Sequence, residues 1–417
     1  MHLSRLRVAL SIAVENARVA AMSGPDTGAG STATIDLGAI AHNVRVLREH
    51  AGDAATMVVV KADAYNHGAL AVARTALAAG ATELGVTTVG EAIALRQAGI
   101  TAPILSWLHR SDTDFAPAIT EGIEIGVSSG AQLAAVAAAA VRTHRTAIVT
   151  LKIDTGLNRN GVASDEFGDV LALLGRTSAD ESVRLRAVFS HLACADVPDN
   201  PANDRQAKVL LDAVATAASA GVRPEIVHLA NSAAALTRPD LRFDMIRPGI
   251  AAYGLSPIPE LGQFGLKPAM TVSASVALVK RVSAGQSVSY GHTWTTPRDT
   301  VLGLIPMGYA DGVTRSLSGR FDVSIGGRRF PSVGRVCMDQ FVVDLGPDGG
   351  GVQEGDAAVL FGSGADGEPL AQEWADTLDT IHYEVVTGIG GRTRRTYIPS
   401  VEHPIGTVLQ SPEEAST

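Results

Sequence analysis

The chain has 417 residues, of which 46% are hydrophobic, so its length suggests two or three domains around a large buried core. Its net charge of -9, without a block of consecutive basic residues, argues against a nucleic-acid-binding or membrane-surface protein. The two cysteines, Cys194 and Cys337, lack the spacing of a disulfide framework or a metal site, and free thiols fit the cytoplasm.

Residues 1–30 precede the first regular pattern. Charged residues interrupt the apolar runs there, so the segment is too broken for a secretory signal and too short to span a membrane. A second methionine, Met22, precedes a run rich in serine and glycine, which is typical of a ragged extension or an upstream start codon. We therefore expect residues 1–30 to be a disordered extension outside the fold.

Between residues 31 and 265, apolar strands alternate with helical patterns. A strand at 33–37 precedes a helix that places Ile40, Val44 and Leu47 on one face. Eight strands are then expected to end near Lys61, Thr87, Trp107, Ser128, Asp154, His191, His228 and Arg247, with a helical segment after each of the first seven. This alternation predicts a (β/α)₈ TIM barrel, whose chemistry gathers at the carboxyl ends of its strands.

Lys61 ends the first of these eight strands, directly after three consecutive valines. A buried amine has a lowered pKa and can attack a carbonyl carbon to form a Schiff base. From the strand alone, a lysine that extends into water is the simpler interpretation. Tyr65 follows in a turn before a helix that starts near Gly68, where a phenol can meet an anion held by backbone amides. A lone tyrosine there is more often a packed surface aromatic.

Polar residues also occupy the ends of the later strands. They are Lys152, Asp154, Asn158 and Arg159 at the fifth, His191 at the sixth, Asn231 and Ser232 after the seventh, and Arg247, Gly249 and Ile250 at the eighth. The last two loops of such barrels frequently bind phosphate. Ser232 is expected to cap a helix, and Gly249 and Ile250 offer open amides, although a purely structural cap explains Ser232 equally well. A phosphate site opposite a strand-end lysine describes a pyridoxal phosphate site.

Residues 266–417 change to an alternation of period two, which predicts a mostly β C-terminal domain. Its strands are expected at 271–282, 301–305, 321–330 with a glycine turn, 333–345 and 357–361. Three glycine-rich segments stand out in it: SVSYG, which contains Tyr290, PMGYADG, and GRVCMD, which contains Met338. Turn chemistry and packing explain each of them when it is taken alone.

In combination, these segments resemble the alanine racemases. The resemblance covers residues 32–400 and rests on VVVKADAYNHG, KIDTGLNRNGV, HLANSAAAL, IRPGIAAYGLSP, VSYGHTW, PMGYADG and GRVCMDQ, in that order. It implies a cytoplasmic racemase that uses pyridoxal 5'-phosphate, interconverts L- and D-alanine, supplies D-alanine for peptidoglycan, and works as a homodimer with shared active sites. No metal, nucleic acid or membrane partner is expected.

The resemblance assigns two catalytic bases on opposite faces of the cofactor. Lys61 would hold pyridoxal phosphate as a Schiff base and act on the D enantiomer, and Tyr290 of the neighbouring subunit would act on the L enantiomer. A free phenol titrates near about 10, so Tyr290 needs activation, which the family provides through His191 hydrogen-bonded to Arg247. Arg247 would also face the pyridine nitrogen of the cofactor, which it cannot readily protonate.

The remaining assignments concern the substrate and the phosphate. Arg159 and the backbone amide of Met338 would bind the substrate carboxylate. The phosphate would be held by Tyr65, Ser232, Gly249 and Ile250. A carbamylated lysine that orients the arginine is expected at Lys152, whereas the simpler interpretation is an ion pair of Lys152 with Asp154.

One position departs from the family pattern. Many members carry a tyrosine two residues after the isoleucine that matches Ile389, where it helps hold the phosphate and narrows the mouth, but this chain has Gly391. Either another residue fills the gap or the mouth is wider, so a broad-specificity or serine racemase stays an alternative. A related barrel-fold decarboxylase would lack the second base. A non-catalytic carrier of the cofactor would resemble the barrel alone, and a scaffold would bind no cofactor.

Overall fold

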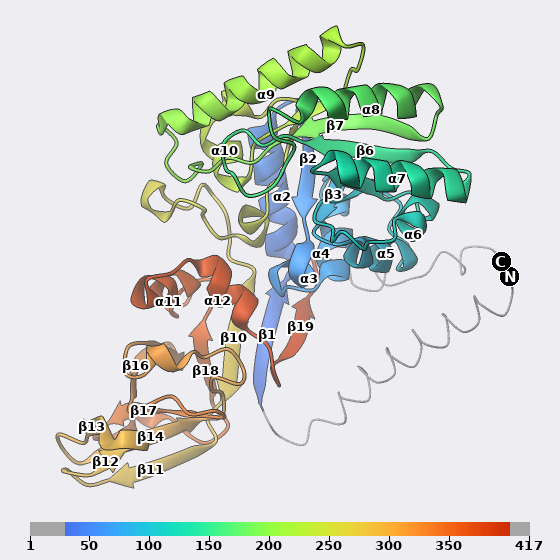
Figure 1. The fold of residues 1–417 in the computed structure, drawn as a ribbon. Coiled ribbons are helices and arrows are strands. Elements are labelled where there is room, and N and C mark those ends of the chain that lie inside the picture. The colour runs from blue at the N-terminus through green and yellow to red at the C-terminus, as the bar shows by residue number, and fades with distance from the viewer. Residues whose placement is uncertain (1–29, 401–417) are drawn as a thin grey trace, which may run out of the picture.

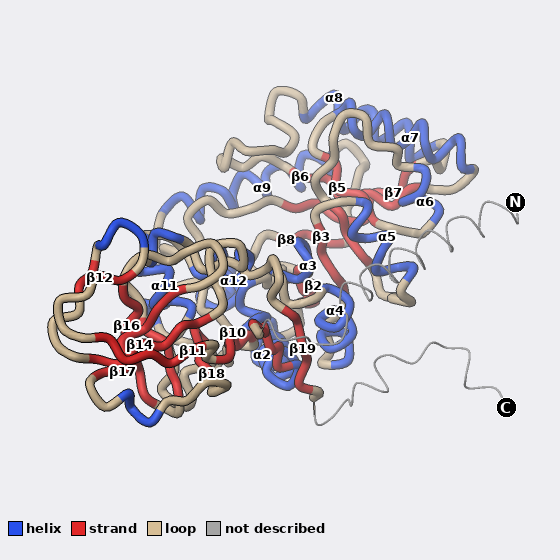
Figure 2. The backbone as a smooth tube through the Cα atoms, turned by 90° about the horizontal axis from the view of Figure 1, so that it is seen from below, coloured by secondary structure: helices blue, strands red, loops and turns tan. Residues whose placement is uncertain are grey.

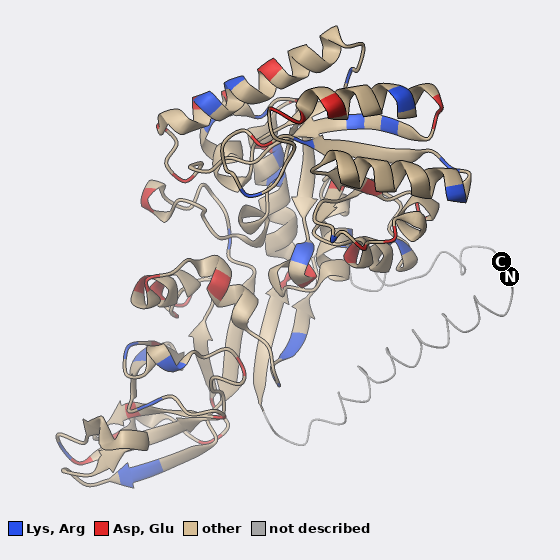
Figure 3. Cartoon of the chain, viewed as in Figure 1, with Lys and Arg blue, Asp and Glu red and all other residues tan. Residues whose placement is uncertain are grey.

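The computed structural model describes residues 30–400, so the expected extension at residues 1–30 lies almost wholly outside the described residues. The chain forms a barrel of parallel strands wrapped by helices and, beside it, a second part built mainly of strands (Figure 1). Viewed from below, the barrel strands lie inside a ring of helices and loops (Figure 2). Basic and acidic residues both occur on each part, so neither part carries one sign of charge alone (Figure 3).

The barrel sheet contains eight parallel strands. They are β2 (Ala55–Val59), β3 (Glu83–Val86), β4 (Ile104–Ser106), β5 (Glu124–Val127), β6 (Ala147–Lys152), β7 (Val183–Phe189), β8 (Ile226–His228) and β9 (Met245–Ile246). The order runs from β8 through β7 to β2 and then to β9. Two backbone bonds approach closure between β8 and β9: Asp244 N donates to Val227 O at 3.1 Å, and Arg247 N donates to Ala230 O at 2.8 Å. The predicted (β/α)₈ barrel is confirmed.

Helices follow each of the first seven barrel strands, as the sequence predicted. They are α3 (Lys61–Tyr65), α4 (Ala69–Ala78), α5 (Val89–Gln97), α6 (Ala116–Thr120), α7 (Gly130–Thr143), α8 (Phe167–Ala179), α9 (Pro201–Ser219) and α10 (Ser232–Thr237). Side-chain caps start several of them: Thr88 and Glu91 form a capping box on α5, and Ser129 caps α7. Alanine, valine and leucine side chains of these helices pack onto the strands and form the outer layer of the core.

A charged layer lies inside the barrel near the amino ends of β3 and β5. Arg186 on β7 donates to both carboxylate oxygens of Glu83 and, at 2.6 Å, to Glu124. Thr150 on β6 donates to the other oxygen of Glu124. Burial raises the pKa of Glu124, and the guanidinium of Arg186 opposes that shift. Each of these buried charges therefore has a partner of opposite sign within the barrel, and Thr150 satisfies the remaining oxygen of Glu124.

The second part contains a nine-stranded sheet. Its strands are β1 (Ser31–Asp36), β10 (Met270–Ser275), β11 (Leu278–Val282), β14 (Thr300–Ile305), β15 (Asp322–Ile325), β16 (Arg328–Val333), β17 (Phe341–Gly346), β18 (Ala357–Phe361) and β19 (Arg394–Ile398). A separate hairpin pairs β12 (Ser287–Val288) with β13 (Trp294–Thr295). Two helices, α11 (Ala371–Leu378) and α12 (His382–Gly388), complete this part.

The first strand of the chain lies in this sheet and not in the barrel. β1 pairs antiparallel with β10 and parallel with β19. The division at residue 265 groups residues 31–36 with the barrel, but their hydrogen bonds place them in the C-terminal sheet. After β1, the side chain of Asp36 caps α2 (Leu37–Ala51), which carries the chain to the barrel. Within residues 30–400, none of the helices combines the length and apolarity that a membrane crossing requires.

Two predicted strands of this domain are divided in the structure. The segment expected at 271–282 forms β10 and β11 with a break after Ser275, and of the segment at 333–345 only β17 is a strand beyond Val333. Residues 334–340 form a loop because Gly334 has φ +68° and the carbonyls of Cys337 and Met338 accept the amides of Tyr309 and Ala310, each at 3.0 Å. The strand at 357–361 is confirmed, whereas α11, α12 and β19 were not predicted.

Candidate active site

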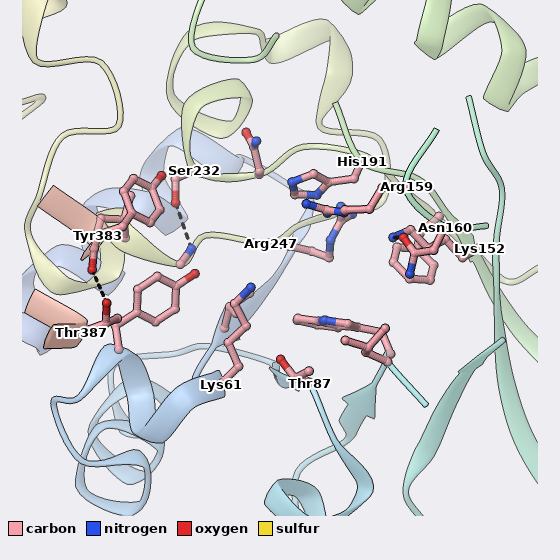
Figure 4. A pocket seen from close by; sticks show the side chains of 18 residues that line it. Lys61, Thr87, Lys152, Arg159, Asn160, His191, Ser232, Arg247, Tyr383 and Thr387 are labelled. Carbon is pink, nitrogen blue, oxygen red and sulfur yellow. Dashed lines mark hydrogen bonds between the residues drawn. The ribbon is translucent and has the colours of Figure 1, made fainter. Parts of the chain in front are cut away.

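A cavity of about 620 Å³ lies at the carboxyl ends of the barrel strands (Figure 4). Its size is that of a pocket for a small ligand or cofactor. Predicted site residues line it: Lys61, Tyr65, Lys152, Arg159, His191, Ser232, Arg247, Gly249 and Ile250. Val59, Thr87, Trp107, Leu108, Asn160, Phe189, Asn231, Tyr383 and Thr387 complete the lining. The structure thus brings together most of the residues that the sequence singled out.

The charges around this cavity are of one sign. Two lysines and two arginines, Lys61, Lys152, Arg159 and Arg247, line it, and none of the described lining residues is an aspartate or glutamate. Like charges in a partly desolvated space repel one another unless an anion joins them. The cavity is therefore suited to an anionic ligand.

Lys61 lies two residues after the last residue of β2 and is the first residue of α3. Its side chain points into the cavity (Figure 4). Burial and the nearby positive charge of Arg159 lower the pKa of Lys61, while Glu91 opposes the shift. A lowered pKa leaves more of the amine neutral at physiological pH, and only the neutral amine is a nucleophile. Lys61 therefore extends into the cavity at the barrel mouth and not outward from the barrel surface.

The backbone after Lys61 is left-handed. Residues 62–66 all have φ between 52° and 65°, although none of them is glycine. This conformation costs roughly 1–2 kcal/mol for each such residue, because Cβ crowds the following carbonyl. Strain of this kind persists only where the surrounding contacts enforce it. The turn that carries Lys61 and Tyr65 is thus held by the rest of the fold, and its sequence shows no glycine signal before Gly68.

The predicted phosphate residues meet at one wall of the cavity. The hydroxyl of Ser232 accepts the amide N–H of Gly249 at 2.9 Å and that of Ala251 at 3.3 Å. A Cβ on Gly249 would lie 2.3 Å from the Tyr65 hydroxyl, so only glycine fits there. Burial raises the pKa of Tyr65, which keeps its hydroxyl protonated and able to donate. Tyr65, Ser232 and Gly249 therefore form one polar cluster.

The helix cap expected at Ser232 lies one residue earlier. Asn231 precedes α10, and its side-chain oxygen accepts the amide of Ala234 at 3.1 Å. Ser232 is instead the first residue of α10 and is free to contact the loop after β9. The purely structural cap is thus not the role of Ser232.

Arg247 is fully buried and makes different contacts from those expected. Its guanidinium donates to Nδ1 of His228 at 3.0 Å and to the carbonyls of Ser190 and Leu229 at 2.7 and 3.1 Å. The expected partner was His191, so that expectation is corrected: the ring that accepts from Arg247 is His228. Burial lowers the pKa of Arg247 to about 9.

His191 lines the cavity beside these groups (Figure 4). Burial, followed by the positive charge of Arg247, lowers the pKa of His191 to about 3, so the ring is neutral at physiological pH. A neutral imidazole can accept a proton or a hydrogen bond from a phenol. His228, stacked 5.1 Å from the ring of Phe189, was not predicted as a site residue.

Lys152 forms no ion pair with Asp154. Its amine donates to the side-chain oxygen of Asn160, and the carboxylate of Asp154 accepts the amides of Gly156 and Asn158 at 3.0 and 3.1 Å. Burial and the positive charges of two arginines lower the pKa of Lys152 to about 8. The simpler interpretation of Lys152 is therefore wrong, and the amine is partly neutral near physiological pH.

Aromatic residues form the apolar wall of the cavity. Trp107 follows β4, and a Cβ on Gly85 or Gly126 would lie within 2.5 to 3.0 Å of Trp107. Gly85 thus makes room for the indole and Gly126 for the Cα and Cβ of Trp107, which the sequence indicated only as a strand end. Phe189 of β7 lies 5.3 Å from the guanidinium of Arg247 and 5.5 Å from the amine of Lys152.

A tyrosine from the β domain lines the cavity, although position 391 is a glycine. Tyr383 on α12 lies 6.1 Å from the ring of Tyr65, and Thr387 of the same helix also lines the cavity. Gly391 itself has φ +61°, and a Cβ there would lie 2.1 Å from the carbonyl oxygen of Ala310. A side chain at 391 is therefore excluded by its neighbours, and Tyr383 brings a phenol to the cavity from another helix.

Two predicted residues do not reach this cavity within the chain. Tyr290, in the short helix between β12 and β13, is 72% exposed, and Met338 is 53% exposed. Neither lines the cavity around Lys61. The hairpin that bears Tyr290 lies at the end of the β domain farthest from the barrel (Figure 1). Any role of these residues beside Lys61 requires another chain.

The geometry can now be compared with known proteins. A profile of the alanine racemase N-terminal domain matches residues 35–257, and a profile of the alanine racemase C-terminal domain matches residues 269–397. The chain belongs to the alanine racemase family. It is accordingly an enzyme of the racemase class.

Individual alanine racemases are similar over nearly their whole length. The alanine racemase of Mycolicibacterium smegmatis is 61% identical over 379 residues, which cover 91% of this chain and 97% of that protein. That of Mycobacterium tuberculosis is 60% identical over 365 residues, 88% of this chain and 95% of that protein. Among solved structures, the alanine racemase of Streptomyces lavendulae has 46% identity and a TM-score of 0.87, covering 90% of this chain and 99% of that one.

Proposed function

We propose that this chain interconverts L- and D-alanine with pyridoxal 5'-phosphate held at Lys61, and supplies D-alanine for peptidoglycan. The observation that carries the proposal is the cavity itself. It joins an amine of lowered pKa, an anion-binding wall and four positive groups without a carboxylate. This set of groups fits an aldehyde that also carries a phosphate. It would serve a decarboxylase or a cofactor carrier equally well, and only a second base distinguishes a racemase from them.

The residues present fit the cofactor. Tyr65, Ser232, Gly249 and Ile250 would hold the phosphate, Arg247 would face the ring nitrogen, and Lys61 would bond to the aldehyde carbon. When bound, pyridoxal phosphate supplies a conjugated ring that withdraws electrons from the substrate α-carbon. Because Arg247 stays charged, it would donate a hydrogen bond to the ring nitrogen without transferring a proton, so the ring would stay unprotonated and withdraw electrons less strongly.

Lys61 and Arg159 would act on the substrate. The guanidinium of Arg159 enters the cavity and would bind the substrate carboxylate, which fixes the orientation of the α-carbon (Figure 4). The neutral amine of Lys61 would take the α-proton on one face or return it there. Racemisation also requires a base on the opposite face, because a single base tends to return the proton to the side it came from.

We infer that the second base is Tyr290 of a second copy of this chain. Tyr290 and Met338 are exposed and lie outside the cavity of their own chain. Tyr309 of the same region is also exposed, at 43%. Exposed aromatic and methionine side chains favour an interface. In a homodimer, Tyr290 would face the neutral ring of His191, and the amide of Met338 would assist Arg159. This arrangement makes each site depend on both subunits.

Lys152 would be carbamylated. Its pKa of about 8 leaves neutral amine to react with carbon dioxide, which forms a carbamate and releases a proton. The resulting anion would lie beside Arg159 and Arg247, whose positive charges it would balance. A cytoplasmic location is also inferred, and it is supported by the two unpaired cysteines.

The proposal is tested on the purified protein. We expect a visible absorbance band that borohydride abolishes, peptide mapping that places the reduced cofactor on Lys61, and loss of optical rotation from L-alanine. Release of carbon dioxide from L-alanine would instead indicate the decarboxylase. Absence of bound cofactor together with absence of racemisation would refute the proposal.

Subunit sharing has its own experiment. Lys61→Ala and Tyr290→Phe proteins, each inactive alone, are mixed under conditions in which subunit exchange is confirmed with labelled chains. Activity that returns toward one quarter of the wild-type value is expected, because only one mixed site in each heterodimer is intact, and half of the dimers are mixed at equal exchange. No recovery despite exchange would place both bases within one chain.

A further inference from the structure

The last strand of the described chain, β19, contacts the left-handed turn at residues 62–66. Arg395 on β19 forms an ion pair with the carboxylate of Asp63 at 2.7 Å, and its other terminal nitrogen donates to the side-chain oxygen of Asn66 at 2.7 Å. The two contacts are three residues apart on the turn. One guanidinium therefore spans the left-handed segment that lies between Lys61 and Gly68.

His67 and Glu91 form further hydrogen bonds with the same turn. Nδ1 of His67 lies 3.1 Å from the carbonyl of Ala64 and 2.9 Å from that of Tyr65, so it donates to both. His67 is fully buried, and burial lowers its pKa to about 4, which keeps the ring neutral. The carboxylate of Glu91 accepts the amide of Ala62 at 2.7 Å. These contacts satisfy polar groups that a right-handed helix would pair internally.

β19 has a fixed position relative to the turn. It is paired along its whole length with β1, and the partner of Arg395 in that register is Ala33. Tyr397, two residues after Arg395, approaches the turn so closely that a Cβ on Gly68 would lie 1.9 Å from the Tyr397 hydroxyl. A side chain fixed on a paired strand can hold a strained turn, whereas one on a loose tail cannot.

The contacts connect the turn to both groups that would meet the cofactor. Lys61 precedes the left-handed residues, and Tyr65 is one of them. A change of the turn toward the right-handed conformation would move the amine and the phenol relative to the wall formed by Ser232 and Gly249. Small displacements of positioned groups lower rates strongly.

We propose that Arg395 is a positioning residue that holds the left-handed turn and thereby fixes Lys61 and Tyr65 at the distance that one bound pyridoxal phosphate requires. This role rests on the proposed function for its chemical meaning. The conformational part, that Arg395 keeps the turn left-handed, stands on the contacts alone.

The experiment compares wild type, Arg395→Met and Arg395→Lys as purified holoenzymes. Hydrogen exchange of the peptide that covers residues 62–69 is measured, together with the rate at which pyridoxal phosphate dissociates. In Arg395→Met we expect exchange of these amides to rise about 10-fold, because they then open more readily. Cofactor dissociation should rise by about the same factor, and Arg395→Lys should fall between the two, because lysine reaches only one of the two partners.

A second substitution separates positioning from general stability. Ala62 is exposed with φ +52°, and glycine adopts this conformation without the cost that alanine bears. Ala62→Gly placed in the Arg395→Met background should recover at least about half of the lost protection and cofactor retention on a logarithmic scale. Ala135→Gly, at an exposed site of α7 in ordinary helical conformation, should recover neither.

A matched control removes an arginine of the β domain elsewhere. Arg329 holds both oxygens of Glu373, at 2.6 and 3.0 Å, so Arg329→Met also breaks a two-point contact. It should leave exchange at 62–69 unchanged. Wild-type exchange and cofactor dissociation in Arg395→Met, or equal effects in Arg329→Met, would overturn the proposal. A wild-type protein without cofactor or racemisation would refute the proposed function alone, because the exchange of the turn is measured independently.

Discussion

The two ends of the barrel interior differ in whether their charged residues have partners of opposite sign. Near the amino ends of the strands, Arg186 is paired with both Glu83 and Glu124, so each buried charge has a partner of opposite sign. At the carboxyl ends, four cations line the cavity without a carboxylate among the described lining residues. The first arrangement is complete within the chain, whereas the second is balanced only by something that binds. Uncompensated charge, more than charge itself, marks the functional end.

The comparison predicts its largest effect at Lys61. Lys61→Ala should lower the rate of alanine racemisation by about 10⁴-fold, because it removes both the covalent attachment and one base. Lys208, exposed on α9 and paired with Asp212, provides the control. Lys208→Ala should leave the rate unchanged when optical rotation is followed under the same conditions. A Lys61→Ala protein that keeps wild-type activity would contradict the assignment.

At the amino ends of the strands, loss of a charged residue should lower the stability of the fold. Arg186→Met leaves two buried carboxylates without a cation and should lower the free energy of unfolding by about 3–5 kcal/mol. Arg184 lies two residues away on the same strand, half exposed and paired with Glu225. Arg184→Met should cost about 0–1 kcal/mol. Urea unfolding of both variants measures the contrast, and equal losses would mean that burial is not what distinguishes the two pairs.

At the uncompensated end, an anion should stabilise the fold. Inorganic phosphate added to cofactor-free protein at 100 times its dissociation constant should raise the free energy of unfolding by about 2.7 kcal/mol. Ser232→Ala should weaken this effect because it removes the hydroxyl that would donate a hydrogen bond to the phosphate beside the amides of Gly249 and Ala251. Thermal unfolding with phosphate and with chloride at equal ionic strength provides the measurement. Equal stabilisation by both salts would indicate screening only.

The smallest expected effect is the pH dependence that Lys152 contributes. Its pKa is lowered from 10.5 to about 8 in the fold, so the unfolded chain binds more protons between these two pH values. The contribution of Lys152 to the free energy of unfolding therefore rises with pH from about 8 to 10.5 and is constant below that window. In buffer free of carbon dioxide, the free energy of unfolding of Lys152→Met should therefore rise less between pH 8 and 10.5 than that of the wild type. Identical curves would show that Lys152 is not desolvated.

How much the sequence predicted depends on the range of the contacts involved. The barrel and Lys61 follow from local alternation and from a rare lysine at a strand end, and both could be read directly. Tyr383 could not, because its helix comes from the β domain and reaches the cavity only through tertiary packing. The left-handed turn was also hidden, since alanine at 62 and 64 disfavours positive φ and a single aspartate at 63 is too weak a signal for a whole turn. The role of Ser232 in holding a phosphate stays a prediction, and its contacts with the amides of Gly249 and Ala251 could not be read from the sequence.

The pairing of β1 with β19 has a consequence for synthesis of the protein. Thr34 and Thr396, whose hydroxyls lie 3.1 Å apart across these strands, are separated by 362 positions along the chain. At roughly 5–20 residues per second, a ribosome needs about 20–70 s between making the one and the other. The barrel can form on the nascent chain during that interval, while β1 lacks both of its neighbours until β10 is made and lacks β19 until the end. The contacts of Arg395 with the left-handed turn are consequently among the last that a newly made molecule forms.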